Sequence, residues 1–193
     1  MPLPASGPRE PMHFRKIDMQ GYRRPDGLYE IEGRLTDTKS DPFTVDVEGH
    51  TIAPGNYLHD MWVRLVVDED LLVHEASACT DASPYGECPQ AAPGIARLKG
   101  ARIESGWRAA IQQRLGGAQG CTHMRELLFT MGSAAYQTLA PIRRHKNMAL
   151  DRKGHPIKLD SCLAYRSEGE LARHKWPAFY TGPASSDSSS GHR

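Results

Sequence analysis

The chain has 193 residues, of which 39% are hydrophobic and 24% are charged, and this composition predicts one globular domain with tails. Its 24 lysines and arginines balance 23 aspartates and glutamates, which argues against a nucleic-acid partner held by a large basic surface. No apolar run approaches the ~18 residues of a membrane span, so no membrane partner is expected either.

The two ends of the chain are predicted to lie outside the folded domain. Residues 1–12 contain four prolines and no periodic apolar pattern, which is typical of a loose arm. Residues 181–193 include a serine-rich tract that cannot build a core, so we expect a disordered tail and a single domain over residues 13–180. The first residues lack the basic and apolar regions of a signal peptide, and the four cysteines fit reduced thiols, which predicts a cytoplasmic protein.

Three segments show the alternation of apolar and polar residues that is typical of half-buried strands. They are residues 29–35, 59–67 and 71–79. The acidic turn at residues 68–70 makes the last two segments a hairpin.

The pattern changes after the hairpin. Residues 81–100 contain so many prolines and glycines that we expect a long loop without regular structure, and loops of this length are often functional. Apolar residues at helical spacing then predict helices over residues 104–115 and 121–139, and residues 157–165 allow a further strand. Strands followed by helices indicate the α+β class, with an antiparallel sheet whose helices pack on the face that carries Met61, Val63 and Leu65.

Polar residues that neither sheet nor helix stability requires occur at three places. His59 and Asp60 open the predicted hairpin, Cys88 lies in the long loop, and Cys121 and His123 stand at the start of the second helix. Imidazole, thiolate and carboxylate are the usual ligands of a four-coordinate zinc or ferrous ion. We therefore expect His59, Cys88, Cys121 and His123 to hold one divalent metal ion at a pocket, with Asp60, Cys121 and His123 as catalytic groups.

Structural roles compete with this interpretation. A lone cysteine usually just packs in the core, which is what we expect of Cys79 and Cys162. His59 could be a strand histidine with satisfied hydrogen bonds. The helix start at Cys121 favours a thiolate, which suits a metal ligand and a nucleophile equally. Since successive strand residues face opposite sides, we favour His59 over Asp60 as the ligand unless the strand is irregular at its start.

Two adjacent arginines, Arg23 and Arg24, precede a turn at residues 25–27. Paired guanidinium groups can clamp a carboxylate or a phosphate, which makes them candidate substrate-binding residues. The alternative is a pair of solvated arginines beside a turn. In that case the nearby acids Glu30, Glu32 and Asp37 would neutralise them.

The chain resembles a bacterial family catalogued as domain of unknown function 2889, over roughly residues 14–140. Five spaced motifs carry the resemblance: Gly21-Tyr22-Arg23-Arg24 with Asp26-Gly27-Leu28, Ile31-Glu32-Gly33 with Leu35 and Asp37, His59-Asp60-Met61, Pro84-Tyr85 with Cys88, and Gly120-Cys121-Thr122-His123. The resemblance implies membership of a family and no particular reaction.

The order of the candidate ligands is also similar to that in iron–sulfur scaffolds of the NifU/IscU type. Those proteins have an antiparallel sheet, a ligand and an aspartate that open a hairpin, a cysteine in the next loop and a His-Cys pair at a helix start. Here His59 replaces the first cysteine, and the last pair becomes Cys121 and His123. The likeness implies a NifU/IscU-like fold and, because three thiolates have become two, one metal site rather than cluster assembly.

Together these patterns predict a small metal-dependent enzyme, of lyase or hydrolase type, that acts on a small carboxylate-bearing compound, with an aromatic acid as one option. One divalent ion, zinc or iron, is the expected cofactor. No nucleotide cofactor is expected, and a homo-oligomer is left open. The alternatives are a non-enzymatic metal or iron–sulfur carrier, and a metal-free thiol enzyme that uses Cys121 with His123 or His59 as base.

Overall fold

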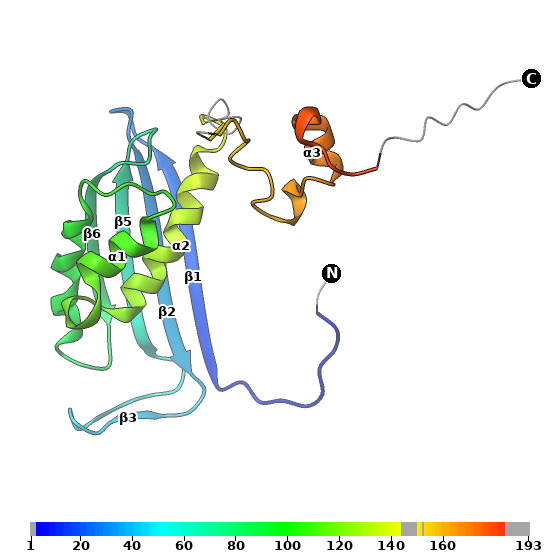
Figure 1. Ribbon diagram of the computed structural model, residues 1–193. Helices are drawn as coiled ribbons and strands as arrows, with labels where there is room; N and C mark the ends of the chain where they lie inside the picture. The colour runs from blue at the N-terminus through cyan, green and yellow to red at the C-terminus, as the bar shows by residue number, and fades with distance from the viewer. Residues whose placement is uncertain (1–2, 144–149, 152, 184–193) are drawn as a thin grey trace, which may run out of the picture. The chain divides into compact units, whose positions relative to one another are not determined.

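Four long strands form the central antiparallel sheet, in a computed structural model that describes residues 3–143, 150–151 and 153–183. They lie in the order β1-β2-β5-β6 (Figure 1). Their bounds are β1 (His13–Arg23), β2 (Tyr29–Lys39), β5 (Tyr57–Val67) and β6 (Val73–Ala82). A short hairpin of β3 (Phe43–Val45) and β4 (His50–Ile52) stands between β2 and β5 in the chain.

The predicted hairpin is the pair β5 and β6, in which Leu65 lies opposite Ala76. The strand expected at residues 29–35 is β2, and it continues to Lys39 with burial alternating along its length. Strand β1 is the long strand of this sheet that the sequence patterns missed. Most of its residues are exposed, because it lies at the edge of the sheet and pairs only with β2, so it lacks the alternation that marks its neighbour.

Two helices cover one face of the sheet. They are α1 (Trp107–Leu115) and α2 (Thr122–Leu139), close to the predicted bounds, with the short 3-10 helix η2 (Gly117–Gln119) between them. Helix α2 crosses the sheet at Gly33, where an added Cβ would lie 3.1 Å from the Leu127 side chain. The indole of Trp107 in α1 donates a 2.9 Å hydrogen bond to the carbonyl of Leu128 in α2.

The face under the helices is the predicted one. Met61, Val63 and Leu65 are at most 1% exposed. Gly33 lies opposite Val63 across the β2–β5 pair, so the helix that touches Gly33 also lies on this face. The α+β fold with an antiparallel sheet is confirmed.

Three local expectations were wrong. Cys79 and Cys162, which were expected to pack in the core, are both exposed. The segment expected to be an irregular loop contains the 3-10 helix η1 (Cys88–Leu98), which buries Ala92, Ile95 and Leu98. Its first proline fits at the start of the helix, because the N–H groups of the first turn have no acceptor within the helix and the missing N–H of proline costs no hydrogen bond. The strand expected at residues 157–165 is absent from the described chain, because Asp160 adopts a left-handed φ of 58° and a short 3-10 helix, η4 (Leu163–Tyr165), follows.

The chain divides into two compact units, residues 1–140 and 141–193. The second unit contains η4, α3 (Glu170–Lys175) and η5 (Pro177–Phe179), and the ring of Trp176 lies 5.7 Å from that of Tyr165, centroid to centroid. The single domain predicted over residues 13–180 stays a prediction.

The predicted tails are described only in part. Residues 3–12 are exposed and have no regular structure, while residues 184–193 of the expected tail lie outside the described residues. None of the helices in the described part of the chain has the length and apolar character that a membrane span requires.

We predict that Leu65→Ala lowers the free energy of unfolding by about 2–5 kcal/mol, because it leaves a cavity beneath the helices at a fully buried position. Urea unfolding measures this change. The matched control is Val47→Ala at a side chain that is 90% exposed, for which we expect little change. A near-neutral Leu65→Ala would contradict the packing described above.

Candidate functional site

A buried carboxylate joins three strands at one end of the sheet. Asp37, near the end of β2, is 1% exposed. Its Oδ1 accepts hydrogen bonds from His13 Nε2 at 2.9 Å and from Arg15 Nε at 2.8 Å. Its Oδ2 accepts from Arg15 Nη2 at 2.8 Å and from His59 Nδ1 at 2.9 Å. Each oxygen therefore has two donors, which fills the lone-pair directions of the carboxylate.

The strand register explains this arrangement. Arg15 of β1 lies directly opposite Asp37, and Asp37 lies directly opposite His59 of β5. Residues opposite each other in neighbouring antiparallel strands share a face of the sheet, here the face that the helices cover. Three residues far apart in the sequence thus form one row across the sheet.

The ionisation of Asp37 fixes the orientation of His59. Burial alone would raise the pKa of Asp37, but the hydrogen bonds from Arg15, His13 and His59 outweigh burial and hold the pKa at about 2. An ionised carboxylate only accepts hydrogen bonds, so Nδ1 of His59 must carry the proton. Burial lowers the pKa of His59 in spite of Asp37, which favours the neutral ring with an unprotonated Nε2.

The start of α2 brings a second imidazole and a thiol to the same place. Cys121 is the extended residue that precedes the helix, and His123 lies in its first turn. The ring centroids of His59 and His123 are 3.9 Å apart, and Cys121 Sγ lies 3.7 Å from His123 Nδ1. Burial, together with the neighbouring His59, lowers the pKa of His123. His59, Cys121 and His123 therefore form one cluster.

This cluster lies in the wall of an open pocket of about 620 Å³. Cys88, at the start of η1, lies in the same wall, together with Tyr85 and Gln119. The pocket is large enough for a small molecule. The structure thus places His59, Cys88, Cys121 and His123 around one cavity.

Asp37, His59 and His123 form a group whose potential ligand atoms lie within 4.8 Å of one another. Asp37 could bind a metal ion directly only by losing one of its four hydrogen bonds. The other potential metal donors in the pocket wall are Nε2 of His59, the imidazole of His123, the thiols of Cys88 and Cys121 and the carboxylate of Glu87. Asp37 is better suited to orient His59, as carboxylates commonly orient metal-binding histidines.

Asp60 does not join the cluster. Its side chain accepts two hydrogen bonds from Arg34, at 2.8 Å to Nε and 2.6 Å to Nη2. The guanidinium of Arg34 in turn lies 4.7 Å from the Trp62 ring, on the face of the sheet opposite the helices. Because strand residues alternate in direction, His59 faces the pocket and Asp60 faces away from it.

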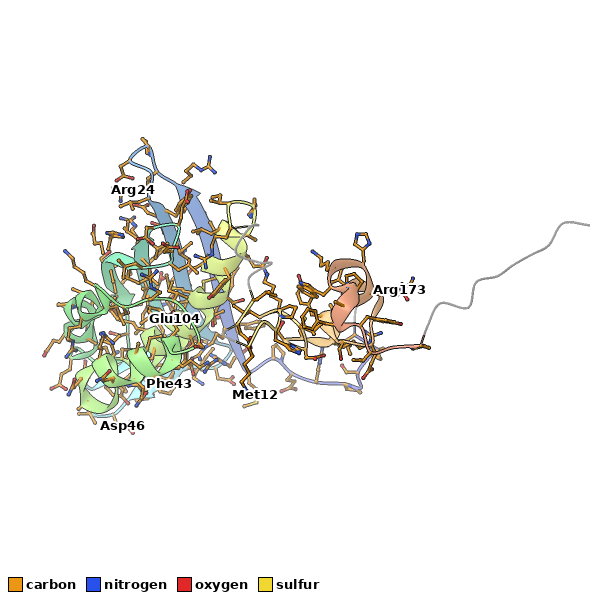
Figure 2. All side chains as sticks on the ribbon, turned by 45° about the horizontal axis from the view of Figure 1, so that its top comes forward. Met12, Arg24, Phe43, Asp46, Glu104 and Arg173 are labelled. Atoms are coloured by element: carbon orange, nitrogen blue, oxygen red, sulfur yellow. The ribbon has the colours of Figure 1, made fainter. Side chains whose placement is uncertain are left out.

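Arg23 and Arg24 also lie away from the cluster. Arg24 forms ion pairs with Asp26 and Glu30, and the guanidinium of Arg23 lies 5.9 Å from the Tyr29 ring. Figure 2 shows Arg24 and Met12 at opposite ends of β1, and the Asp37 group lies at the Met12 end. The length of β2 separates the two arginines from Asp37 by roughly 25 Å.

The alternative of two solvated arginines beside a turn named Glu30, Glu32 and Asp37 as neutralising acids, and of these Glu30 does pair with Arg24. The other two acids pair elsewhere. Asp37 pairs with Arg15, and Glu32 pairs with Arg64.

Sequence reasoning missed Asp37, Arg15 and His13 as site residues. A signal for Asp37 was present, because the inward positions of its strand continue from Leu35 to Asp37, where a charged side chain replaces an apolar one. A charge at a predicted core position requires a partner. No comparable signal marks His13 or Arg15, which belong to the strand that the patterns did not reveal.

We predict that Asp37→Asn lowers the free energy of unfolding by about 3–5 kcal/mol. The amide is uncharged, and its NH₂ group cannot accept the hydrogen bonds that one carboxylate oxygen now accepts. Chemical denaturation measures the loss. The control is Asp26→Asn, an ion-paired aspartate in an exposed turn, which should leave the unfolding midpoint nearly unchanged. Equal effects of the two substitutions would contradict the role given to Asp37.

Comparison with known proteins identifies a family and nothing more specific. No curated protein and no solved structure matches the chain, and the likeness to iron–sulfur scaffolds finds no support. A family model described as Protein of unknown function (DUF2889) matches residues 13–137. The match begins at the first residue of β1 and includes Asp37, His59, Cys121 and His123. It covers well over half of the chain, which therefore belongs to the DUF2889 family.

Proposed function

We propose that the pocket at the start of α2 binds one divalent metal ion, zinc or iron, and that the protein is a small metal-dependent enzyme of lyase or hydrolase type. The observation that supports this most is the meeting of His59 and His123, whose rings lie 3.9 Å apart at the pocket wall. A fixed carboxylate behind one imidazole, with the Cys121 thiol beside the other, is a typical environment of a metal-binding site.

The two histidines are already in the protonation state that metal binding requires. Burial lowers the pKa of both histidines, so neutral imidazoles with free lone pairs predominate at neutral pH. His59 Nε2 and His123 would be two of the ligands, and Cys121 and Cys88 are the candidates for the others. Such an ion supplies Lewis acidity toward a substrate oxygen or a water molecule. The wide pocket leaves room for a substrate beside it.

The position of the arginines changes the expected mode of substrate binding. Arg23 and Arg24 lie too far from the pocket to clamp a carboxylate there. No lysine or arginine is among the described residues that line the pocket. We therefore propose that the substrate's oxygen atoms bind the metal ion itself, while Tyr85 and the amides of Gln90 and Gln119 contact the rest of a small molecule.

One distance favours a second candidate, a metal-free thiol enzyme. Cys121 Sγ lies 3.7 Å from Nδ1 of His123. A neutral imidazole at this position can accept the thiol proton and generate a nucleophilic thiolate. In this case His59 would support His123 by ring contact, and Asp37 would hold His59.

Titration of the metal-free protein with cobalt(II) distinguishes the two candidates. The metal hypothesis predicts one equivalent of bound cobalt, visible bands of a four-coordinate ion and a thiolate-to-cobalt charge-transfer band that Cys121→Ser weakens. We expect His59→Ala and His123→Ala each to weaken binding at least about 100-fold, because each removes a ligand. The control His74→Ala changes an exposed histidine that pairs with Asp68, and it should leave binding unchanged.

Other outcomes would overturn the proposal. Cobalt binding that neither pocket-histidine substitution weakens would place the metal elsewhere. Iron with labile sulfide in anaerobically purified protein would favour a carrier. Absence of metal binding, with rapid alkylation of Cys121 that slows in His123→Ala, would favour the thiol enzyme.

A further inference from the structure

Met61 brings a thioether to the cluster of His59, Cys121 and His123. It follows His59 by two residues in β5, so the alternation along the strand directs both side chains to the face that the helices cover. Its Sδ atom lies 3.9 Å from Sγ of Cys121, which donates a weak hydrogen bond to it. The thiol therefore has a sulfur neighbour in the sheet as well as a nitrogen neighbour, His123, in the helix that follows it.

The distances within this group fit four donors around one ion. Cys121 Sγ lies 3.9 Å from Met61 Sδ and 3.7 Å from His123 Nδ1. The ring of His123 in turn lies 3.9 Å from that of His59, centroid to centroid. Donor atoms that share a four-coordinate ion, at bond lengths of about 2.0–2.3 Å, lie roughly 3–4 Å from each other. The group thus offers two imidazoles, one thiol and one thioether to a single ion.

The chemical type of the fourth donor indicates which ion suits the group. Zinc sites use thiolate, imidazole and carboxylate ligands, and a thioether is not part of these usual sets. Soft sulfur ligands, both cysteine and methionine, favour copper(I). Two imidazoles and one thiolate, with a methionine sulfur at the fourth position, are a ligand set that binds copper in proteins. The thioether of Met61 therefore favours copper over zinc or iron.

The position of Met61 suits a ligand that approaches an ion from the core. Met61 is fully buried and is not among the described residues that line the pocket. His59, Cys121 and His123 do line it. An ion that enters from the pocket would meet these three side chains first and would have Met61 on its inner side. The buried sulfur would keep water from that side, which suits copper(I) because this ion prefers soft donors to water oxygen.

We propose that this site also binds one copper(I) ion through His59, Met61, Cys121 and His123, with Met61 as the ligand that favours copper over zinc. The inference rests on the proposed function in one respect, because it uses the same metal-binding cluster. It adds a fourth donor from the core and needs no ligand from Cys88. When the ion binds, the thiol of Cys121 releases its proton to solvent and a copper–thiolate bond forms.

Titration of the full chain with copper(I), under anaerobic conditions, tests the proposal. Bicinchoninate, a chelator that forms a coloured copper(I) complex, competes with the protein and removes copper(I) from isolated thiols. We expect the protein to retain one equivalent of copper(I), and X-ray absorption should find two sulfur ligands. The control Cys79→Ser changes an exposed thiol outside the cluster, and it should leave both results unchanged.

Two methionine variants separate coordination from packing, because leucine has a similar volume but no sulfur. Met61→Leu should weaken copper(I) binding at least about tenfold and leave one sulfur ligand, while cobalt(II) binding stays unchanged. Met131→Leu changes another fully buried methionine, whose sulfur lies beside Gly33 of the sheet, and it should alter none of these results. Thermal unfolding verifies that both variants fold.

The copper proposal is overturned if the protein holds no copper(I) against bicinchoninate, or if Met61→Leu keeps the same affinity or both sulfur ligands. It is also overturned if His59→Ala and His123→Ala leave copper(I) binding unchanged. An equal loss of copper(I) and cobalt(II) binding in Met61→Leu would show that Met61 only packs. The proposed function fails separately: if copper(I) binds as described and cobalt(II) does not bind, the divalent-metal enzyme is excluded and the copper site stands.

Discussion

The hydrogen bonds of Asp37 are the interaction on which the rest of the site depends. A carboxylate that is 1% exposed can keep its charge only if donors replace the water it has lost. β1 supplies three of the four donors and β5 supplies the fourth. The same contacts that make the charge tolerable also bind three strands together at one end of the sheet and hold the ring of His59 in one orientation.

Arg15 extends this network to the helix layer. While two of its nitrogens bind Asp37, Nη1 lies 2.7 Å from Glu126 of α2. Close packing also fixes the same helix at the next residue, Leu127, whose side chain occupies the space that Gly33 leaves. The start of α2 is thus held over the start of β5, and this places Cys121 and His123 beside His59. The position of the cluster follows from sheet register and helix packing together.

Much of the fold could be predicted from the sequence, because burial leaves periodic patterns. Apolar residues such as Leu65 alternate with residues of the opposite face along β5, and the apolar residues of α2 recur at helical spacing. The edge strand β1 has one neighbour and little burial, so it leaves no such pattern. The 3-10 helix at Cys88 was hidden by its prolines, which are usual signs of a loop.

The sequence predicted only those site residues whose side chains are themselves typical metal ligands or catalytic groups. His59, Cys121 and His123 were identifiable as chemical groups, and the structure brings them together. The exclusion of Asp60 depends on the direction of one strand residue and on its partner, Arg34. The part played by Arg15 depends on a strand register that no local pattern encodes.

The central claim is that an ionised Asp37 holds His59 in a single tautomer whose free nitrogen is available at the pocket. Nitrogen-15 NMR of the metal-free protein, correlating the ring protons of His59 with both ring nitrogens at neutral pH, tests this claim directly. We expect a neutral ring that is protonated at Nδ1 and unprotonated at Nε2. A ring protonated at Nε2, or at both nitrogens, would contradict it.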